Sequence, residues 1–111
     1  MIIRIDARRL TDAVGLHAVV SEAFGFPATY GKNLDALIDC LSSLDNPRAG
    51  MTRFHVAAGQ VAIVALEHLD AASKQASAQA SALIDALAFV NWRRVERGQP
   101  PVLAVAYERA P

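Results

Sequence analysis

The chain has 111 residues, a length typical of one domain, and 53% of them are hydrophobic, which is enough for one compact core. Lysine plus arginine and aspartate plus glutamate both number 11, so the formal net charge is zero and no overall field favours nucleic acid or an anionic membrane. We therefore expect a single domain over residues 1–111, in which any recognition that depends on charge is local.

The first part of the chain predicts a strand followed by a helix. Residues 2–5 are rich in β-branched side chains and precede charged residues, a pattern typical of a short strand. Apolar side chains then recur at near-helical spacing, from an expected N-cap at Thr11 to Gly25. Gly25 is expected to end this helix, and Pro27 supports the same boundary.

A loop and a second helix are expected next. Residues 27–32 predict a tight loop, in which Gly31 supplies a backbone conformation that other residues resist. Asn33 is a good N-cap for a helix that runs to about Leu44. The turn-forming residues 45–50 then predict a surface loop.

The second half of the chain predicts two more strands and a long helix. Residues 61–66 are apolar on both alternating faces, as in a strand that is covered on both sides, and residues 54–56 form either a hairpin with it or a loop that leads into it. We expect a short helix over about residues 67–74 and a long, alanine-rich helix over residues 75–97. Residues 102–107 predict the last strand.

These elements together predict an α/β fold. Three strands separated by helical segments favour a three-stranded parallel β-sheet flanked by helices, because parallel neighbours need crossover connections of about a dozen or more residues. Right-handed crossovers between consecutive strands give the simplest topology.

The N-terminal segment and the cysteine content bear on the compartment. The sequence lacks the basic stretch and long apolar run of a signal peptide, and no apolar segment approaches the roughly 20 residues that span a bilayer. Cys40 is the one cysteine and cannot form an internal disulfide, which fits a reducing compartment. We therefore expect a cytoplasmic protein that does not bind a membrane.

No set of side chains in the sequence is typical of a catalytic or metal site. His17, His55 and His68 are far apart and have no cysteine partner, so we expect no metal ion. Cys40 falls near the apolar stripe of the second helix, which favours a buried structural thiol over a nucleophile. No glycine-rich loop is placed to hold a phosphate group. We expect no cofactor and no catalytic residue, and so not an enzyme.

A basic cluster lies near the end of the long helix and consists of Trp92, Arg93, Arg94 and Arg97. An aromatic residue among arginines can bind single-stranded nucleic acid. Basic side chains are also favoured in the last turn of a helix, where they oppose the negative end of its dipole. This second interpretation needs no partner, and we expect no direct binding of nucleic acid.

The second helix has two faces at about 100° per residue. Its leucines share one stripe, which we expect to be buried: Leu34, Leu37, Leu41 and Leu44. Three polar side chains lie roughly opposite, facing outward: Asp35, Asp39 and Ser42. Ile38 lies between the faces, close enough to the acidic one to make an exposed apolar contact. From spacing alone, a solvated helix face explains the acidic residues more simply than a binding surface does.

One block of the sequence is more specific. It comprises Pro27, Tyr30-Gly31, Asn33-Leu34-Asp35-Ala36-Leu37 and Asp39-Cys40-Leu41. This block resembles the signature of the barstar family, intracellular inhibitors of small secreted microbial ribonucleases. So dense a match is far more specific than a short degenerate pattern. The predicted order of strands and helices also agrees with the family along nearly the whole chain.

The resemblance implies a barstar-like fold without catalytic activity, in a one-to-one complex with a small secreted ribonuclease or a related toxin. In that family the segment that matches residues 27–44 plugs the active site of the enzyme, and the aspartate that matches Asp39 takes the place of an RNA phosphate. A carboxylate can accept paired hydrogen bonds from arginine much as a phosphate does. The partner-binding residues expected from the resemblance are Thr29, Tyr30, Gly31, Asn33, Asp35, Ile38, Asp39 and Ser42.

Several residues depart from the family pattern. Thr29 and Ile38 stand where family members often carry aromatic side chains, so two expected anchors are smaller. Lys32 replaces a commonly acidic residue, and no acid among residues 91–93 matches a glutamate that helps binding in the best-known member. Residues 48–60 look like an insertion relative to short members. These departures favour a target other than barnase, and the alternative is a barstar-fold interaction module with a non-nuclease partner.

Overall fold

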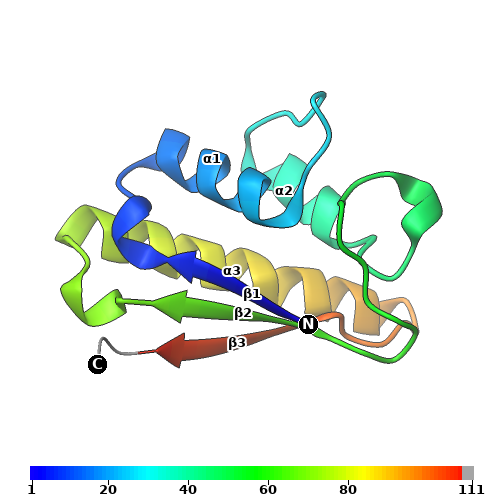
Figure 1. Ribbon diagram of the computed structural model, residues 1–111. Helices are drawn as coiled ribbons and strands as arrows, with labels where there is room; N and C mark the ends of the chain where they lie inside the picture. The colour runs from blue at the N-terminus through cyan, green and yellow to red at the C-terminus, as the bar shows by residue number, and fades with distance from the viewer. Residues whose placement is uncertain (109–111) are drawn as a thin grey trace.

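A computed structural model describes residues 1–108 of the chain and shows one three-stranded sheet (Figure 1). The strands β1 (Ile2–Asp6), β2 (Ala62–Glu67) and β3 (Leu103–Glu108) lie in the order β1-β2-β3, and both pairs are parallel. Because consecutive strands are neighbours, each crossover joins adjacent strands. The predicted α/β fold with a three-stranded parallel sheet is confirmed.

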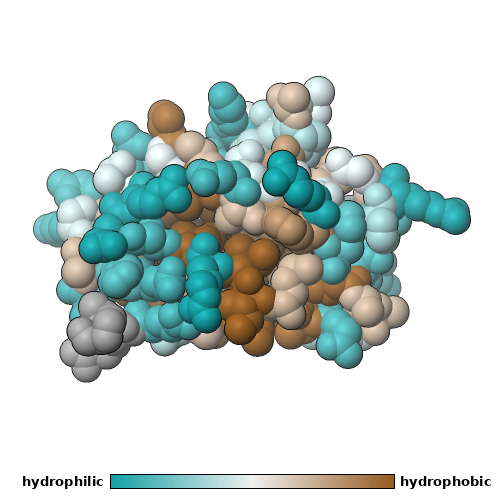
Figure 2. All heavy atoms as spheres, viewed as in Figure 1, coloured by the Kyte–Doolittle hydropathy of each residue, from teal (hydrophilic) through white to brown (hydrophobic). Residues whose placement is uncertain are grey.

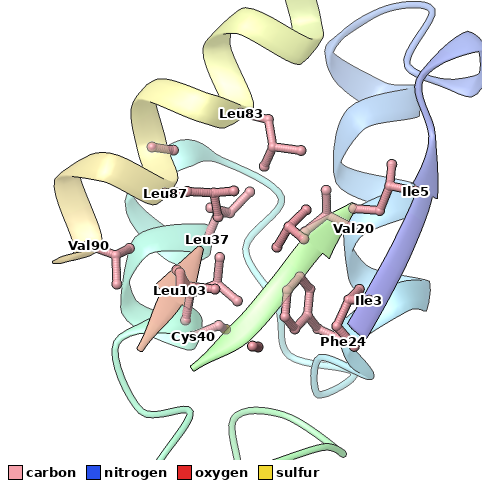
Figure 3. Packing of buried hydrophobic residues seen from close by; sticks show 14 of the residues in the cluster. Ile3, Ile5, Val20, Phe24, Leu37, Cys40, Leu83, Leu87, Val90 and Leu103 are labelled. Carbon is pink, nitrogen blue, oxygen red and sulfur yellow. The ribbon is translucent and has the colours of Figure 1, made fainter. Parts of the chain in front are cut away.

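The helices α1 (Ala13–Phe24), α2 (Leu34–Leu41) and α3 (Lys74–Glu96) pack on one face of this sheet. Figure 3 shows Ile3 and Ile5 of β1 directed toward Val20 and Phe24 of α1, with Leu87 of α3 in the same core. No helix in the described part of the chain is long and apolar enough to cross a membrane.

The opposite face of the sheet carries an ionic cluster instead of a second layer of helices. Arg4 Nη1 donates to Glu108 Oε1 at 2.7 Å and lies 3.5 Å from Glu67 Oε2, above the central strand. Figure 2, in the view of Figure 1, shows apolar and hydrophilic spheres side by side over the strands. The helices cover only one face of β2, so the expected cover on both sides is confirmed only in part. On the open face Ala65, whose partner in β1 is Arg4, is 1% exposed, whereas Ile63 and Glu67 are half-buried.

Several helix boundaries differ from the expected ones. The N-cap of α1 is Asp12 rather than Thr11, because the Asp12 carboxylate accepts the Gly15 backbone N–H at 2.7 Å. The N-cap of α2 is Asn33, as predicted, but the helix ends at Leu41 instead of near Leu44. The short helix expected over residues 67–74 is only a 3-10 turn, Leu69–Ala71, before α3 begins.

The segment between α2 and β2 is a packed loop and not a hairpin. It contains a 3-10 turn, Pro47–Ala49, and then crosses the C-terminal ends of α1 and α2. The Arg53 backbone N–H donates to the Phe24 carbonyl at 2.9 Å, and the Val56 N–H donates to the Leu44 carbonyl at 3.0 Å. The segment that looked like an insertion thus covers the ends of α1 and α2.

Gly25 makes this crossing possible. Its φ of 68° lies in the left-handed region, and an added Cβ would meet Arg53 Cβ at 2.5 Å. Any other residue would therefore be strained and would also push the crossing segment away. The glycine ends α1 and permits the close approach of the loop.

Candidate binding surface

The helix α2 is divided into an inner and an outer face, as its sequence predicts. Leu37 and Leu41 are fully buried and Cys40 is 2% exposed, whereas Asp35 and Asp39 are exposed. The Asn33 side chain accepts the Ala36 N–H at 2.8 Å and so fixes where the helix begins. The inner residues anchor the helix in the core, and the carboxylates therefore project from a rigid base.

Leu34 does not follow the expected leucine stripe, because it is 43% exposed. It occupies the first position of α2, where the helix emerges from the loop and the core no longer reaches it. Leu44, at the other end of the stripe, is fully buried although it lies beyond the helix. The prediction that all of these leucines are buried was wrong for Leu34 alone.

Tyr30 holds the loop before α2 from the inside. Its hydroxyl shares a 2.6 Å hydrogen bond with His17 Nδ1 of α1, and its ring lies 4.7 Å from that of Phe26. Burial, with a smaller contribution from Cys40, raises the pKa of Tyr30 to about 12, and burial lowers the pKa of His17. Both side chains are thus neutral near pH 7, and Tyr30, only 9% exposed, positions the loop.

The left-handed residue of this loop is Lys32 and not Gly31. Lys32 has a φ of 56°, whereas Gly31 has no positive φ. Lys32 directly precedes the N-cap Asn33, which is extended, with a φ of −138°. A Cβ on Gly31 would only reach 3.4 Å from its neighbours, an ordinary contact. The prediction for Gly31 was therefore wrong.

Two hollows flank Tyr30. A small one, about 150 Å³, lies between the loop and the outer face of α2, and its lining comprises Pro27, Thr29, Tyr30, Gly31, Ala36, Asp39, Cys40 and Met51. A groove of about 540 Å³ lies between α1 and the start of α2, and its lining comprises Ala13, Val14, His17, Ala18, Ser21, Tyr30, Lys32, Asn33 and Leu34.

The hollows show which expected contact residues lie together. Thr29, Tyr30 and Gly31 share the small hollow with Asp39, whereas Asn33 lines the groove. Asp35 lines neither hollow. Sequence reasoning missed the groove. Val14 of α1, which lines it, is apolar but 78% exposed, and this exposure became visible only in the structure.

At the other end of α2, Arg94 of α3 binds the segment that follows α2. Its guanidinium donates to both carboxylate oxygens of Asp45, at 2.6 and 3.2 Å, and to the Ser42 carbonyl at 2.8 Å. A fourth hydrogen bond joins Arg94 Nε to the Pro100 carbonyl at 2.9 Å. The Arg94 side chain is 5% exposed, so this member of the basic cluster is a structural clamp.

Arg93, the preceding residue, reaches the acidic face of α2. Its Nη2 donates to Ser42 Oγ at 2.6 Å and lies 3.5 Å from Asp39 Oδ1. Ser42 Oγ in turn donates to the Ile38 carbonyl at 2.6 Å. Sequence spacing does not indicate this contact, because α2 and α3 are distant along the chain. Ser42 is therefore engaged within the protein, and a cation accompanies Asp39.

Cys40, the one thiol of the chain, is buried in the core. Burial, with a smaller contribution from Asp39, raises the pKa of the Cys40 thiol, so it stays protonated and is a poor nucleophile. Among residues 1–108, no group of three or more His, Cys, Asp or Glu side chains is arranged to hold a metal ion.

Comparison with known proteins identifies one family. A family model described as Barstar (barnase inhibitor) matches residues 1–106. The match includes the loop, α2, the strands β1 and β2, and the first part of β3. No curated protein of similar sequence matches the chain. The match agrees with the parallel sheet and with the division of α2 into a buried and an acidic face.

Proposed function

The chain belongs to the barstar family, and from this premise we propose that it inhibits a secreted microbial ribonuclease by covering the active site with residues 27–44. The family is one of inhibitors, which supports the general function. The observation that carries the finer proposal is the outward projection of Asp35 and Asp39 from α2, with Asp39 beside the small hollow.

Asp39 is proposed to act as the phosphate mimic. Its side chain is 66% exposed, so a guanidinium of a partner can approach it, while the helix that carries it is anchored by Leu37 and Leu41. A rigid base reduces the conformational entropy that binding removes. A bidentate pair with arginine would then reproduce how that arginine holds an RNA phosphate.

The other proposed contact residues have different roles around Asp39. Thr29, Gly31 and Asp35, which are exposed, would touch the partner directly. Ile38 is half-buried against the core and would contact the partner through its exposed part only. The remaining three are proposed to act mainly by holding the loop, the start of α2 and Arg93 in place: Tyr30, Asn33 and Ser42. We propose that the protein forms a one-to-one complex and is not an enzyme.

A cytoplasmic location belongs to the same proposal. An inhibitor of this kind would work as an immunity protein, protecting the cell that makes the ribonuclease or a related toxin before secretion. This role requires no cofactor, no direct contact with nucleic acid and no membrane.

Inhibition assays test the proposal directly. The purified chain is mixed with a panel of secreted microbial ribonucleases, including any encoded beside its gene, and RNA hydrolysis is followed. We expect stoichiometric inhibition of at least one enzyme, lost in Asp39→Ala and kept in the matched control Asp85→Ala, which removes an exposed carboxylate from α3. Full RNA hydrolysis by every enzyme at micromolar inhibitor would contradict the proposal.

A second candidate function is binding of a non-nuclease protein through the same face. It is favoured by the cation beside Asp39, because the pair resembles a phosphate less closely than a free carboxylate does. Affinity capture that depends on Asp39, together with no inhibition in the panel, would support this alternative.

A further inference from the structure

The acidic face of α2 carries a resident cation. Arg93 Nη2 lies 3.5 Å from Asp39 Oδ1, and the two side chains differ in exposure, 24% for Arg93 and 66% for Asp39. Arg93 is thus held against the protein, while most of Asp39 stays accessible. Any group that binds Asp39 from solvent must approach within reach of the guanidinium.

Ser42 keeps Arg93 in this place independently of Asp39. The Ser42 hydroxyl gives its single proton to the Ile38 carbonyl at 2.6 Å, so its lone pairs remain for Arg93 Nη2, also at 2.6 Å. The hydrogen bond to Ser42 is shorter than the contact with Asp39. When a partner binds Asp39, Arg93 therefore stays beside the new contact.

We propose that Arg93 is a specificity-determining residue of the binding face, an inference that rests on the proposed function. A partner that surrounds Asp39 with several cations also meets the positive charge of Arg93, and the repulsion between these like charges disfavours its binding. A partner that offers one cation to Asp39 and a carboxylate or carbonyl to Arg93 satisfies both residues. The face therefore favours a ribonuclease whose active site presents a cation to Asp39 and, beside it, a carboxylate or carbonyl to Arg93.

Charge reversal at Arg93, with barnase as the probe, tests this inference. Barnase is the enzyme named in the description of the family, and an enzyme site that holds an RNA phosphate is expected to present cations. We expect Arg93→Glu to bind barnase about tenfold more tightly than the unaltered chain, because a repelling charge becomes an attracting one. Arg93→Gln, which removes the charge without adding an acid, is expected to give a smaller gain.

Lys74→Glu is the matched control for the change in net charge. Lys74 is exposed at the first position of α3, roughly 28 Å from Arg93 along the helix axis, well beyond a screening length of about 8 Å at physiological salt. It should therefore leave the affinity for barnase nearly unchanged. Thermal unfolding of each variant checks that the fold is kept, and a loss of structure would lower the affinity, opposite to the expected gain.

The second arm uses the ribonuclease that the unaltered chain inhibits best. Against that enzyme, Arg93→Glu is expected to weaken binding, because the acceptor that faces Arg93 then meets a carboxylate. Equal effects of Arg93→Glu and Lys74→Glu on barnase would overturn the inference, and so would tighter binding of barnase by the unaltered chain than by Arg93→Glu.

The two proposals fail in different ways. If the unaltered chain inhibits a ribonuclease and Asp39→Ala does not, while Arg93→Glu behaves like its control, the inhibitor function stands and the role of Arg93 is wrong. If Arg93→Glu gains affinity but the bound enzyme still hydrolyses RNA at its full rate, the charge effect stands and the inhibitor function is wrong.

Discussion

The inner and outer faces of α2 divide its eight residues between two opposite purposes. On the inner face, Leu37 and Leu41 lose all contact with solvent, and on the outer face Asp35 and Asp39 keep theirs. An isolated helix of this length would be unstable in water. The inner face therefore supplies stability, the outer face is free to supply recognition, and substitutions on the two faces should have separable effects.

The two ends of α2 add to this division. At the start, Asn33 caps the helix and Tyr30 holds the loop through His17. Beyond the end, Arg94 binds Asp45 and the Ser42 carbonyl. The helix is fixed at three sites in all, which explains how so short an element can present its carboxylates in a defined geometry.

Leu37→Ala should have the largest effect on stability. Removing a fully buried side chain loses transfer free energy and leaves a cavity, so we expect the free energy of unfolding to fall by about 3 to 5 kcal/mol. Urea unfolding measures the loss. A change below about 1 kcal/mol would show that the inner face contributes little.

Arg94→Ala should have the next largest effect. It leaves the Asp45 carboxylate and the Ser42 carbonyl without their partner, and we expect a loss of about 2 to 3 kcal/mol. The exposed Arg97→Ala provides the control on the same helix end and should change stability by less than about 0.5 kcal/mol. Equal losses in the two variants would contradict the structural role of Arg94.

Tyr30→Phe tests how the loop is held. The substitution keeps the ring but leaves buried His17 Nδ1 without its hydrogen bond, at an expected cost of about 1 to 2 kcal/mol. Thermal unfolding and the inhibition assay together give the result. An unchanged melting temperature would mean that packing against Phe26 alone holds the loop.

The pH dependence of stability should reveal the buried His17. Burial lowers the pKa of His17 in the folded chain below its ordinary 6.5, so the unfolded chain binds the proton more readily. The free energy of unfolding should hold above pH 6.5 and decline as the pH falls below it. Urea unfolding at several pH values measures this decline, which His17→Gln should reduce. The same decline in both proteins would assign it to other groups.

The sequence was sufficient for features that depend on local patterns. The N-cap at Asn33 and the burial of Cys40 follow from residue type and helical spacing. The capping residue of α1 was harder, because Thr11 and Asp12 are adjacent and both suitable. The resemblance to the barstar family, confirmed by the match over residues 1–106, is the basis of the proposed binding role, which spacing alone did not indicate.

Features that depend on distant contacts could not be predicted. Arg93 and Asp39 are 54 residues apart, and nothing in the spacing of either helix indicates that they meet. Leu34 continues the leucine stripe but is exposed, because the core does not extend to the first residue of α2. Each of these depends on how α1, α2 and α3 are placed relative to one another, which only the tertiary structure gives.

The smallest effect on stability and the largest on binding should come from one substitution, Asp39→Ala. An exposed carboxylate contributes at most a few tenths of a kcal/mol to folding, so the melting temperature should hardly change. Binding to the inhibited ribonuclease should weaken by several kcal/mol, because the partner's cations lose their counter-charge. Calorimetric titration alongside thermal unfolding measures both. A large fall in melting temperature with unchanged affinity would contradict the account.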